Sequence, residues 1–142
     1  MNLVIDASVA IKWFAPESLS REAAHLLDGG DALFAPDFLL VECGNIIWKK
    51  VRLGELTRAD GDVALGALRS GPIDFVGTRP FVERALHLAH EIEHPLYDCL
   101  YLAAAEAVGA TVVTADRRFF DRCSASMMQS HTVWLADWPP GP

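Results

Sequence analysis

The sequence predicts a single α/β domain, a three-layer α/β/α sandwich with a central parallel five-stranded sheet. Three observations predict this fold. Short apolar runs that suit buried strands alternate with longer segments bounded by helix-capping residues. The strand runs are continuously apolar, as expected when helices cover both faces of a sheet. The length of 142 residues is near the commonest size of one domain, and no linker or repeat divides it.

Five strands are expected, each a short run of mostly apolar residues. They lie at residues 2–6, 32–35, 73–76, 111–114 and 132–135. At least one predicted helix separates each strand from the next, so the strands should be parallel and joined by right-handed crossovers. We expect the domain to cover residues 1–138 and to end in a frayed tail at 139–142, which reads Pro-Pro-Gly-Pro.

Residues that start or stop helices bound the segments between these strands. The expected helices lie at residues 8–14, 20–29, 36–52, 57–70, 79–93, 97–108 and 117–123. Ser8 can cap the first helix, which Pro16 should end, and Ser20 should start the second. The Gly29-Gly30 pair is a natural stop for the second.

The later helices carry similar signals. Pro36 opens the long third helix and Gly54 follows its end, while Thr57 can cap the fourth. The His94-Pro95 pair separates the fifth helix from the sixth, and Gly109 follows the sixth.

Composition indicates the class of protein and its compartment. Hydrophobic residues make up 51% of the chain, yet no apolar run approaches the ~18 residues that span a bilayer. The N-terminus lacks the basic segment and cleavage site of a secretory signal, so we expect a cytoplasmic protein without a membrane segment. Cys43, Cys99 and Cys123 fit neither a zinc spacing nor a disulfide framework, and we expect reduced thiols.

The net charge is −7, from 19 acidic and 12 basic residues. This balance argues against a generic nucleic-acid coat protein, which should be basic. It leaves a nuclease open, since bound cations reverse the charge that an acidic site presents to phosphate. Half of the basic residues follow soon after Glu42 or Asp116, although solvated helix ends would explain the same pattern. These bases are Lys49, Lys50, Arg52, Arg117, Arg118 and Arg122.

Four acidic residues interrupt apolar runs: Asp6, Glu42, Asp98 and Asp116. Burying a carboxylate costs free energy unless it is paired or bound to a metal, so four such positions suggest one shared site. Asp6 and Asp116 lie at or just past the ends of predicted strands, where open parallel sheets bind ligands. In isolation, Asp98 would instead be a first-turn acid favoured by the helix dipole.

Three polar side chains accompany these acids: Ser8, Asn45 and Thr114 each lie within three residues of one of them. Such groups can orient carboxylates or a metal-bound water. A helix cap and a strand-end residue are simpler alternative roles for Ser8 and Thr114.

Clustered carboxylates repel one another, and an oxygen-only ligand set favours Mg²⁺ or Mn²⁺ over Zn²⁺. The sequence contains no G-x-x-x-x-G-K-[ST], G-x-G-x-x-G or G-x-S-x-G motif. Ser8 stands where a phosphatase D-x-D loop has its second Asp, which disfavours an aspartyl-phosphate mechanism. The pattern that remains indicates carboxylate-bound Mg²⁺ acting on a phosphodiester.

Four segments resemble motifs of the PIN-domain nucleases, specifically the VapC-type toxins of bacterial toxin–antitoxin pairs. The segments are VIDASVAIKW at 4–13, APD at 35–37 with ECGNIIW at 42–48, YDCLYLA at 97–103 and TADRRF at 114–119. The resemblance implies a parallel five-stranded sheet and a metal site made by Asp6, Glu42, Asp98 and Asp116. It further implies endoribonuclease activity that leaves 5′-phosphate and 3′-hydroxyl ends, a cognate antitoxin and a homodimer.

Departures from the family pattern are small. Gly44 stands where the family commonly has Ala or a larger apolar residue, and Cys99 stands where it commonly has Ala. Neither change removes an acid. Some relatives use a further acid after the last motif. Asp121 is a candidate for that role, although a solvated helix position is the simpler interpretation, and the role of Asp137 stays open.

The sequence as a whole predicts a Mg²⁺- or Mn²⁺-dependent endoribonuclease that is the toxin of a type II toxin–antitoxin pair. Lys49, Arg117 and Arg118 are the candidate contacts to substrate phosphate. A hydrophobic antitoxin segment would lie along a groove for which Trp13, Phe14 and Trp48 are candidates, unless they serve core packing. Two alternatives stay open: a catalytically weak PIN-fold binding module that acts mainly through its partner, and a small-molecule metal-dependent phosphatase.

Overall fold

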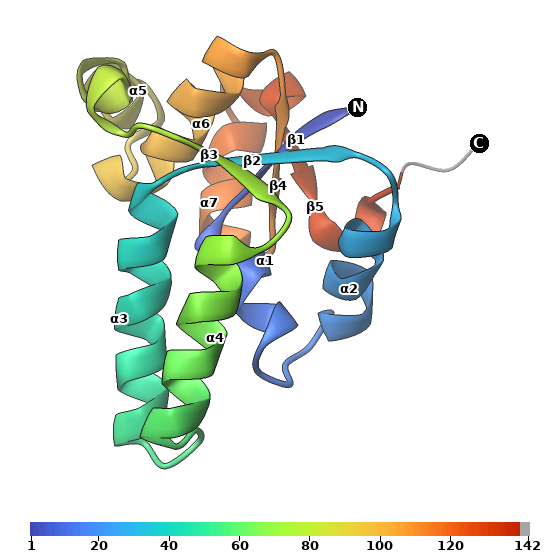
Figure 1. The fold of residues 1–142 in the computed structure, drawn as a ribbon. Coiled ribbons are helices and arrows are strands. Elements are labelled where there is room, and N and C mark those ends of the chain that lie inside the picture. Colours follow the sequence, from blue (N-terminus) through green and yellow to red (C-terminus); the bar gives the residue numbers. More distant parts are fainter. Residues whose placement is uncertain (140–142) are drawn as a thin grey trace.

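Five parallel strands form one sheet in the order β3-β2-β1-β4-β5 (Figure 1). Their bounds are Asn2–Ile5 (β1), Ala32–Pro36 (β2), Ile73–Val76 (β3), Thr111–Thr114 (β4) and Thr132–Trp134 (β5). In the centre, Val4 of β1 pairs with Phe34 of β2 on one side and Val112 of β4 on the other. The predicted parallel five-stranded sheet is therefore confirmed. The computed structural model describes residues 1–139, so residues 140–142 of the expected tail lie outside the described residues.

Helices flank this sheet and complete the predicted α/β/α arrangement. Within residues 1–139 they are Ala7–Ala10 (α1), Ser20–Asp28 (α2), Phe38–Arg52 (α3), Arg58–Ser70 (α4), Val82–Ile92 (α5), Leu96–Val108 (α6) and Arg117–Ser124 (α7). Helix α6 packs on β1, β2 and β4, and α5 packs on α6. Helices α3 and α4 pack on each other and extend away from the sheet in Figure 1.

The first helix differs from its prediction in length and in its capping residue. It runs only from Ala7 to Ala10 and continues as a 3-10 turn over Ile11–Trp13. Asp6 is the N-cap, because its carboxylate accepts a hydrogen bond from the backbone N–H of Val9 at 3.2 Å. The proposed Ser8 cap is therefore wrong, since Ser8 lies inside the first turn.

Most other helix boundaries match the capping signals. Thr57 and Asp60 form a reciprocal capping box at the start of α4, with side-chain to backbone distances of 3.0 and 3.4 Å. Gly109 ends α6 in a left-handed conformation with φ of +66°, which a residue with a Cβ adopts less readily. The expected helix over 79–93 is divided into a 3-10 turn at Arg79–Phe81 and α5.

The core surrounds β1 and α6. Leu3, Val4 and Ile5 have no exposed surface, and every residue of α6 from 99 to 105 is buried. This burial explains why these two turns of α6 carry no charge. The three cysteines are buried free thiols, as expected, and burial raises the pKa of each to about 12, so they stay uncharged. Among residues 1–139, no helix combines the length and apolar character of a membrane span.

Candidate functional site

Asp6 follows directly after the carboxyl end of β1 and is almost completely buried, with 2% of its surface exposed. Its Oδ1 accepts hydrogen bonds from the Ser8 hydroxyl at 2.6 Å and from the Val9 backbone at 3.2 Å. Burial raises the pKa of Asp6 from 3.8 to about 7 despite these donors, and the nearby charge of Asp98 raises it further. A buried carboxylate of this kind is suited to bind a cation.

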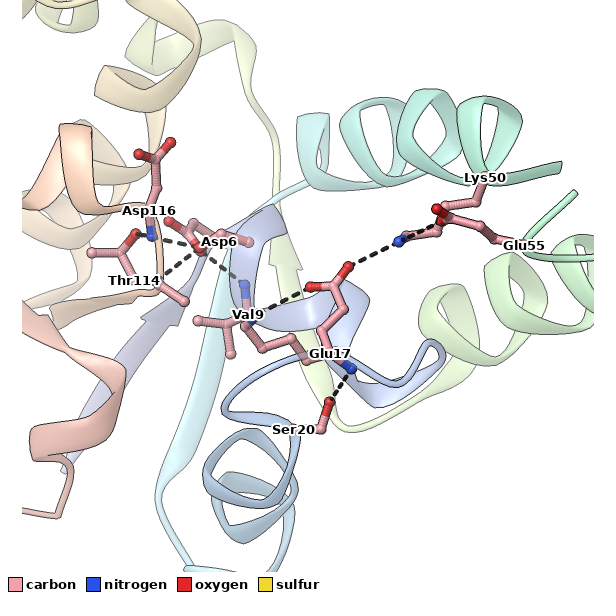
Figure 2. A network of polar contacts seen from close by, with 11 residues as sticks. Asp6, Val9, Glu17, Ser20, Lys50, Glu55, Thr114 and Asp116 are labelled. Atoms are coloured by element: carbon pink, nitrogen blue, oxygen red, sulfur yellow. Dashed lines mark hydrogen bonds and ion pairs between the residues drawn. The ribbon is translucent and has the colours of Figure 1, made fainter. Parts of the chain in front are cut away.

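Asp116 lies two residues past the carboxyl end of β4, which is the neighbour of β1. Its Oδ1 accepts a hydrogen bond from the Phe119 backbone at 3.2 Å and so caps α7. The Asp116 backbone donates to Thr114 Oγ1 at 3.1 Å, and the Ser8 hydroxyl accepts from the Ala115 backbone at 2.8 Å. Because Ser8 also contacts Asp6, these hydroxyls join the ends of β1 and β4 and place Asp6 and Asp116 together (Figure 2).

Glu42 comes to this edge of the sheet from the middle of α3. The hydroxyl of Tyr101, a completely buried residue of α6, donates a hydrogen bond to Glu42 Oε1 at 2.7 Å. Burial raises the pKa of Glu42, the Tyr101 hydrogen bond opposes this shift, and the charges of Asp98 and Asp116 add to it.

Asp98 lies in the first turn of α6. Its Oδ2 is 2.5 Å from Nε2 of His94, whose side chain is only 4% exposed. Burial raises the pKa of Asp98, His94 opposes the shift, and the charge of Asp116 adds to it. The imidazole fixes the carboxylate in one orientation, as supporting groups do for metal ligands.

The structure thus brings the four acids from four elements to one edge of the sheet. Asp98 influences the pKa of both Asp6 and Glu42, and Asp116 that of both Glu42 and Asp98. In the described part of the chain, no lysine or arginine forms an ion pair with any of the four. Their negative charge is therefore left for a cation to balance.

The donor set suits a hydrated Mg²⁺ or Mn²⁺ ion. Within residues 1–139, no three His, Cys, Asp or Glu side chains converge closely enough to hold an ion directly in this conformation. Mg²⁺ does not require such a cage, since it keeps several waters and typically binds one or two carboxylates. The all-oxygen carboxylates therefore fit this ion, with water as the remaining ligand.

The remaining predicted residues occupy different surroundings. Ser8 and Thr114 lie against the acids as described, whereas Asn45 is exposed and hydrogen-bonds to none of the four acids within residues 1–139. It lines a hollow with Glu42 instead. Lys49 lines a second hollow, which includes Asp116.

The arginines that follow Asp116 are exposed on α7. The Arg117 guanidinium lies 3.9 Å from the Trp134 ring centre and 3.9 Å from Asp121. Arg118 lines one hollow with Arg117 and Asp121. Asp137 is also exposed.

Sequence reasoning missed Tyr101 and His94. Tyr101 follows Asp98 by three residues on α6, and His94 precedes it by four residues, before the helix begins. Their partners could not be read from that spacing alone. Of the groove candidates, Trp48 is exposed, whereas the Trp13 indole donates a hydrogen bond to the Ala23 carbonyl at 2.8 Å.

A family model described as the PIN domain matches residues 3–124. The chain belongs to the PIN-domain family. The resemblance of the four sequence segments to this family is thereby confirmed.

Known proteins with a similar sequence or fold include three that cover most of the chain. Ribonuclease VapC3 of Pyrobaculum aerophilum is 28% identical over 127 residues, which are 88% of this chain and 97% of the relative. The crystal structure of PAE2754 from Pyrobaculum aerophilum has a TM-score of 0.72 at 21% identity, covering 96% of this chain and 90% of that one. A toxin–antitoxin complex from Klebsiella pneumoniae contains a chain with a TM-score of 0.59 at 18% identity, covering 94% of this chain and 97% of that one. These two structural similarities show that the fold is shared.

Proposed function

We propose that this PIN-domain protein is a Mg²⁺- or Mn²⁺-dependent endoribonuclease and the toxin of a type II toxin–antitoxin pair. The observation that carries the proposal is the meeting of Asp6, Glu42, Asp98 and Asp116 without a lysine or arginine partner in the described residues. Similarity to a protein named as a ribonuclease over nearly its whole length supports RNA as the substrate.

The four acids would hold the ion, directly or through its coordinated waters. When bound, Mg²⁺ would supply a water of lowered pKa as the nucleophile and would stabilise charge on the leaving oxygen. Tyr101 holds Glu42, and His94 holds Asp98, each through one hydrogen bond. Ser8 and Thr114 keep Asp6 and Asp116 at adjacent strand ends. These contacts preorganise the carboxylates, so little reorganisation is needed when RNA binds.

The proposed partners are RNA, a cognate antitoxin and a second copy of the chain, and the proposed compartment is the cytoplasm. The fold similarity to a chain in a toxin–antitoxin complex supports the antitoxin. The exposed side chain of Trp48 on α3 is a candidate contact for its hydrophobic segment.

The test is cleavage of a mixed RNA by purified protein with Mg²⁺, with Mn²⁺ and with EDTA. We expect metal-dependent cuts that leave 5′-phosphate ends and are lost in Asp98→Asn. Asp74→Asn is a matched control, because Asp74 is an exposed acid on β3. Turnover of a chromogenic phosphate monoester with intact RNA would favour a phosphatase. Metal binding without either reaction would favour a binding module.

A further inference from the structure

All three lysines of this chain line one surface hollow. The chain has twelve basic residues, and Lys12, Lys49 and Lys50 are its only lysines. They come from the turn after α1 and from the C-terminal end of α3. The hollow has a volume of about 500 Å³, and its lining also includes Ser8 and Asp116 of the candidate active site.

Two of these lysines are fixed by one carboxylate. Glu17 receives Lys12 Nζ at 3.0 Å on one oxygen and Lys50 Nζ at 2.9 Å on the other. Lys50 also lies 3.3 Å from Glu55. Figure 2 shows Glu17 between the Asp6 region and the Lys50–Glu55 pair. The lysine side chains are only 8% and 15% exposed, so their ammonium groups are held in place before any ligand arrives.

This arrangement suits a phosphate ligand. Ordering a free lysine costs side-chain entropy, and here that cost is met during folding. Three lysines and three acids, Glu17, Glu55 and Asp116, line the hollow. Apart from Asp116, whose charge the proposed metal ion would balance, the lining carries one net positive charge. Lys49 is exposed and forms no ion pair within residues 1–139, so its charge is free to meet a ligand. A polyanion bound near Asp116 would therefore lie beside these lysines.

We propose that this hollow binds a backbone phosphate of the RNA beside the scissile phosphate, through Lys12, Lys49 and Lys50. The inference rests on the proposed ribonuclease function, because Asp116 connects the hollow to the acids. Glu17 is a positioning residue in this scheme. It keeps two ammonium groups in register and does not contact the substrate.

The test is equilibrium binding of a fluorescein-labelled single-stranded RNA, measured by anisotropy in an Asp98→Asn background that blocks cleavage. For each variant, the dissociation constant at about 200 mM salt divided by that at about 50 mM salt gives a salt ratio. Each lost phosphate contact should lower this ratio roughly threefold, since counterion release sets the salt dependence. Lys12→Gln and Lys50→Gln are expected to show this drop, and Lys50→Arg should keep the parent ratio.

Matched controls come from an exposed ion pair elsewhere. Arg84 and Glu106 join α5 to α6 at 2.9 Å, and neither lines the hollow. Arg84→Gln and Glu106→Gln therefore change the net charge as the test variants do, and they should leave the ratio unchanged. Thermal unfolding of each variant confirms that the protein measured is folded.

Glu17→Gln separates phosphate binding from a purely structural role. If the lysines bind phosphate, Glu17→Gln keeps both ammonium charges, so the salt ratio stays at the parent value while the loss of their fixed positions weakens RNA binding at both salt concentrations. If the cluster is only a brace, Glu17→Gln acts like the lysine variants, and that outcome overturns the inference. Unchanged salt ratios in the lysine variants also overturn it, even if the wild-type protein cleaves RNA. Loss of the proposed function would show separately, as absence of metal-dependent cleavage by the wild-type protein.

Discussion

Asp6 and Glu17 are both acids near α1, but their surroundings are opposite. Asp6 is buried among uncharged donors, chiefly the Ser8 hydroxyl and the Val9 backbone, and its pKa is raised to about 7. Glu17 is partly buried between two lysines. Burial acts to raise its pKa too, but the hydrogen bonds from Lys50 and Lys12 outweigh this and lower it. The fold therefore provides lysine counterions for Glu17 and none for Asp6 within the described residues.

The difference indicates two uses of buried charge. The Glu17 cluster is balanced by the protein itself and fixes the position of its members. The Asp6 site is left electrostatically unfavourable, which is expected where a divalent cation completes the site. Neutral substitutions at the two positions should therefore have opposite effects.

The largest effect is expected for Asp6→Asn on RNA cleavage. Loss of a group that merely supports a metal ligand typically costs 10–100-fold, so loss of a ligand should lower kcat by roughly a hundredfold or more. Cleavage rates at saturating Mg²⁺ measure this change. Asp74→Asn serves as the control, and near-normal cleavage by Asp6→Asn would remove Asp6 from the proposed metal site.

The second effect is on stability without metal. The folded state keeps the Asp6 proton up to about pH 7, whereas the unfolded state releases it near pH 3.8. The free energy of unfolding contributed by Asp6 is thus present below pH 3.8 and lost as the pH rises towards 7. We expect a fall on the order of 2 kcal/mol between about pH 5 and about pH 8 in EDTA.

Urea unfolding at these two pH values measures this fall. Asp6→Asn should flatten the pH dependence, and Mg²⁺ should restore stability at the higher pH by binding the ionised form. An equally steep fall in Asp6→Asn would place its origin in other groups, such as Glu42 and Asp98, whose pKa values are also raised.

Tyr101→Phe should produce a smaller effect by releasing Glu42. The substitution removes only the hydroxyl that lies 2.7 Å from Glu42 Oε1 and keeps the buried ring. Loss of such a supporting contact should weaken Mn²⁺ binding about tenfold. Isothermal titration with Mn²⁺ measures this change directly, independently of RNA cleavage. Tyr97→Phe is the matched control, since Tyr97 is an exposed tyrosine on the same helix.

The smallest effect is expected for Glu17→Gln on stability. The substitution leaves Lys12 and Lys50 close together without the carboxylate that pairs with both. We expect the free energy of unfolding to fall by about 1 kcal/mol at neutral pH, since partly exposed ion pairs contribute little. Urea unfolding of Glu17→Gln and of Asp6→Asn at about pH 8 without metal tests whether the two substitutions change the free energy of unfolding in opposite directions. A gain in stability for Glu17→Gln would contradict the comparison.

Local patterns predicted most of the fold and the acids of the candidate site. The continuous apolar character of β1 and β4 predicted buried parallel strands, and Thr57 predicted the capped start of α4. The Ser8 cap was wrong because Asp6, one residue before the helix, competes successfully for the free backbone N–H. Propensity gives both residues a capping role, and only packing decided between them.

The chain alone specified the alternation of strands and helices and the four acids set among apolar residues, because hydrophobic periodicity and the cost of burying a charge act through near neighbours in sequence. The tertiary structure alone decided which groups meet those acids. Tyr101 reaches Glu42 because α6 and α3 both pack against β2, and Lys12 meets Lys50 at Glu17 because the turn after α1 lies against the end of α3. Such contacts depend on how distant elements pack, and that information is spread over the whole core rather than carried by any one segment.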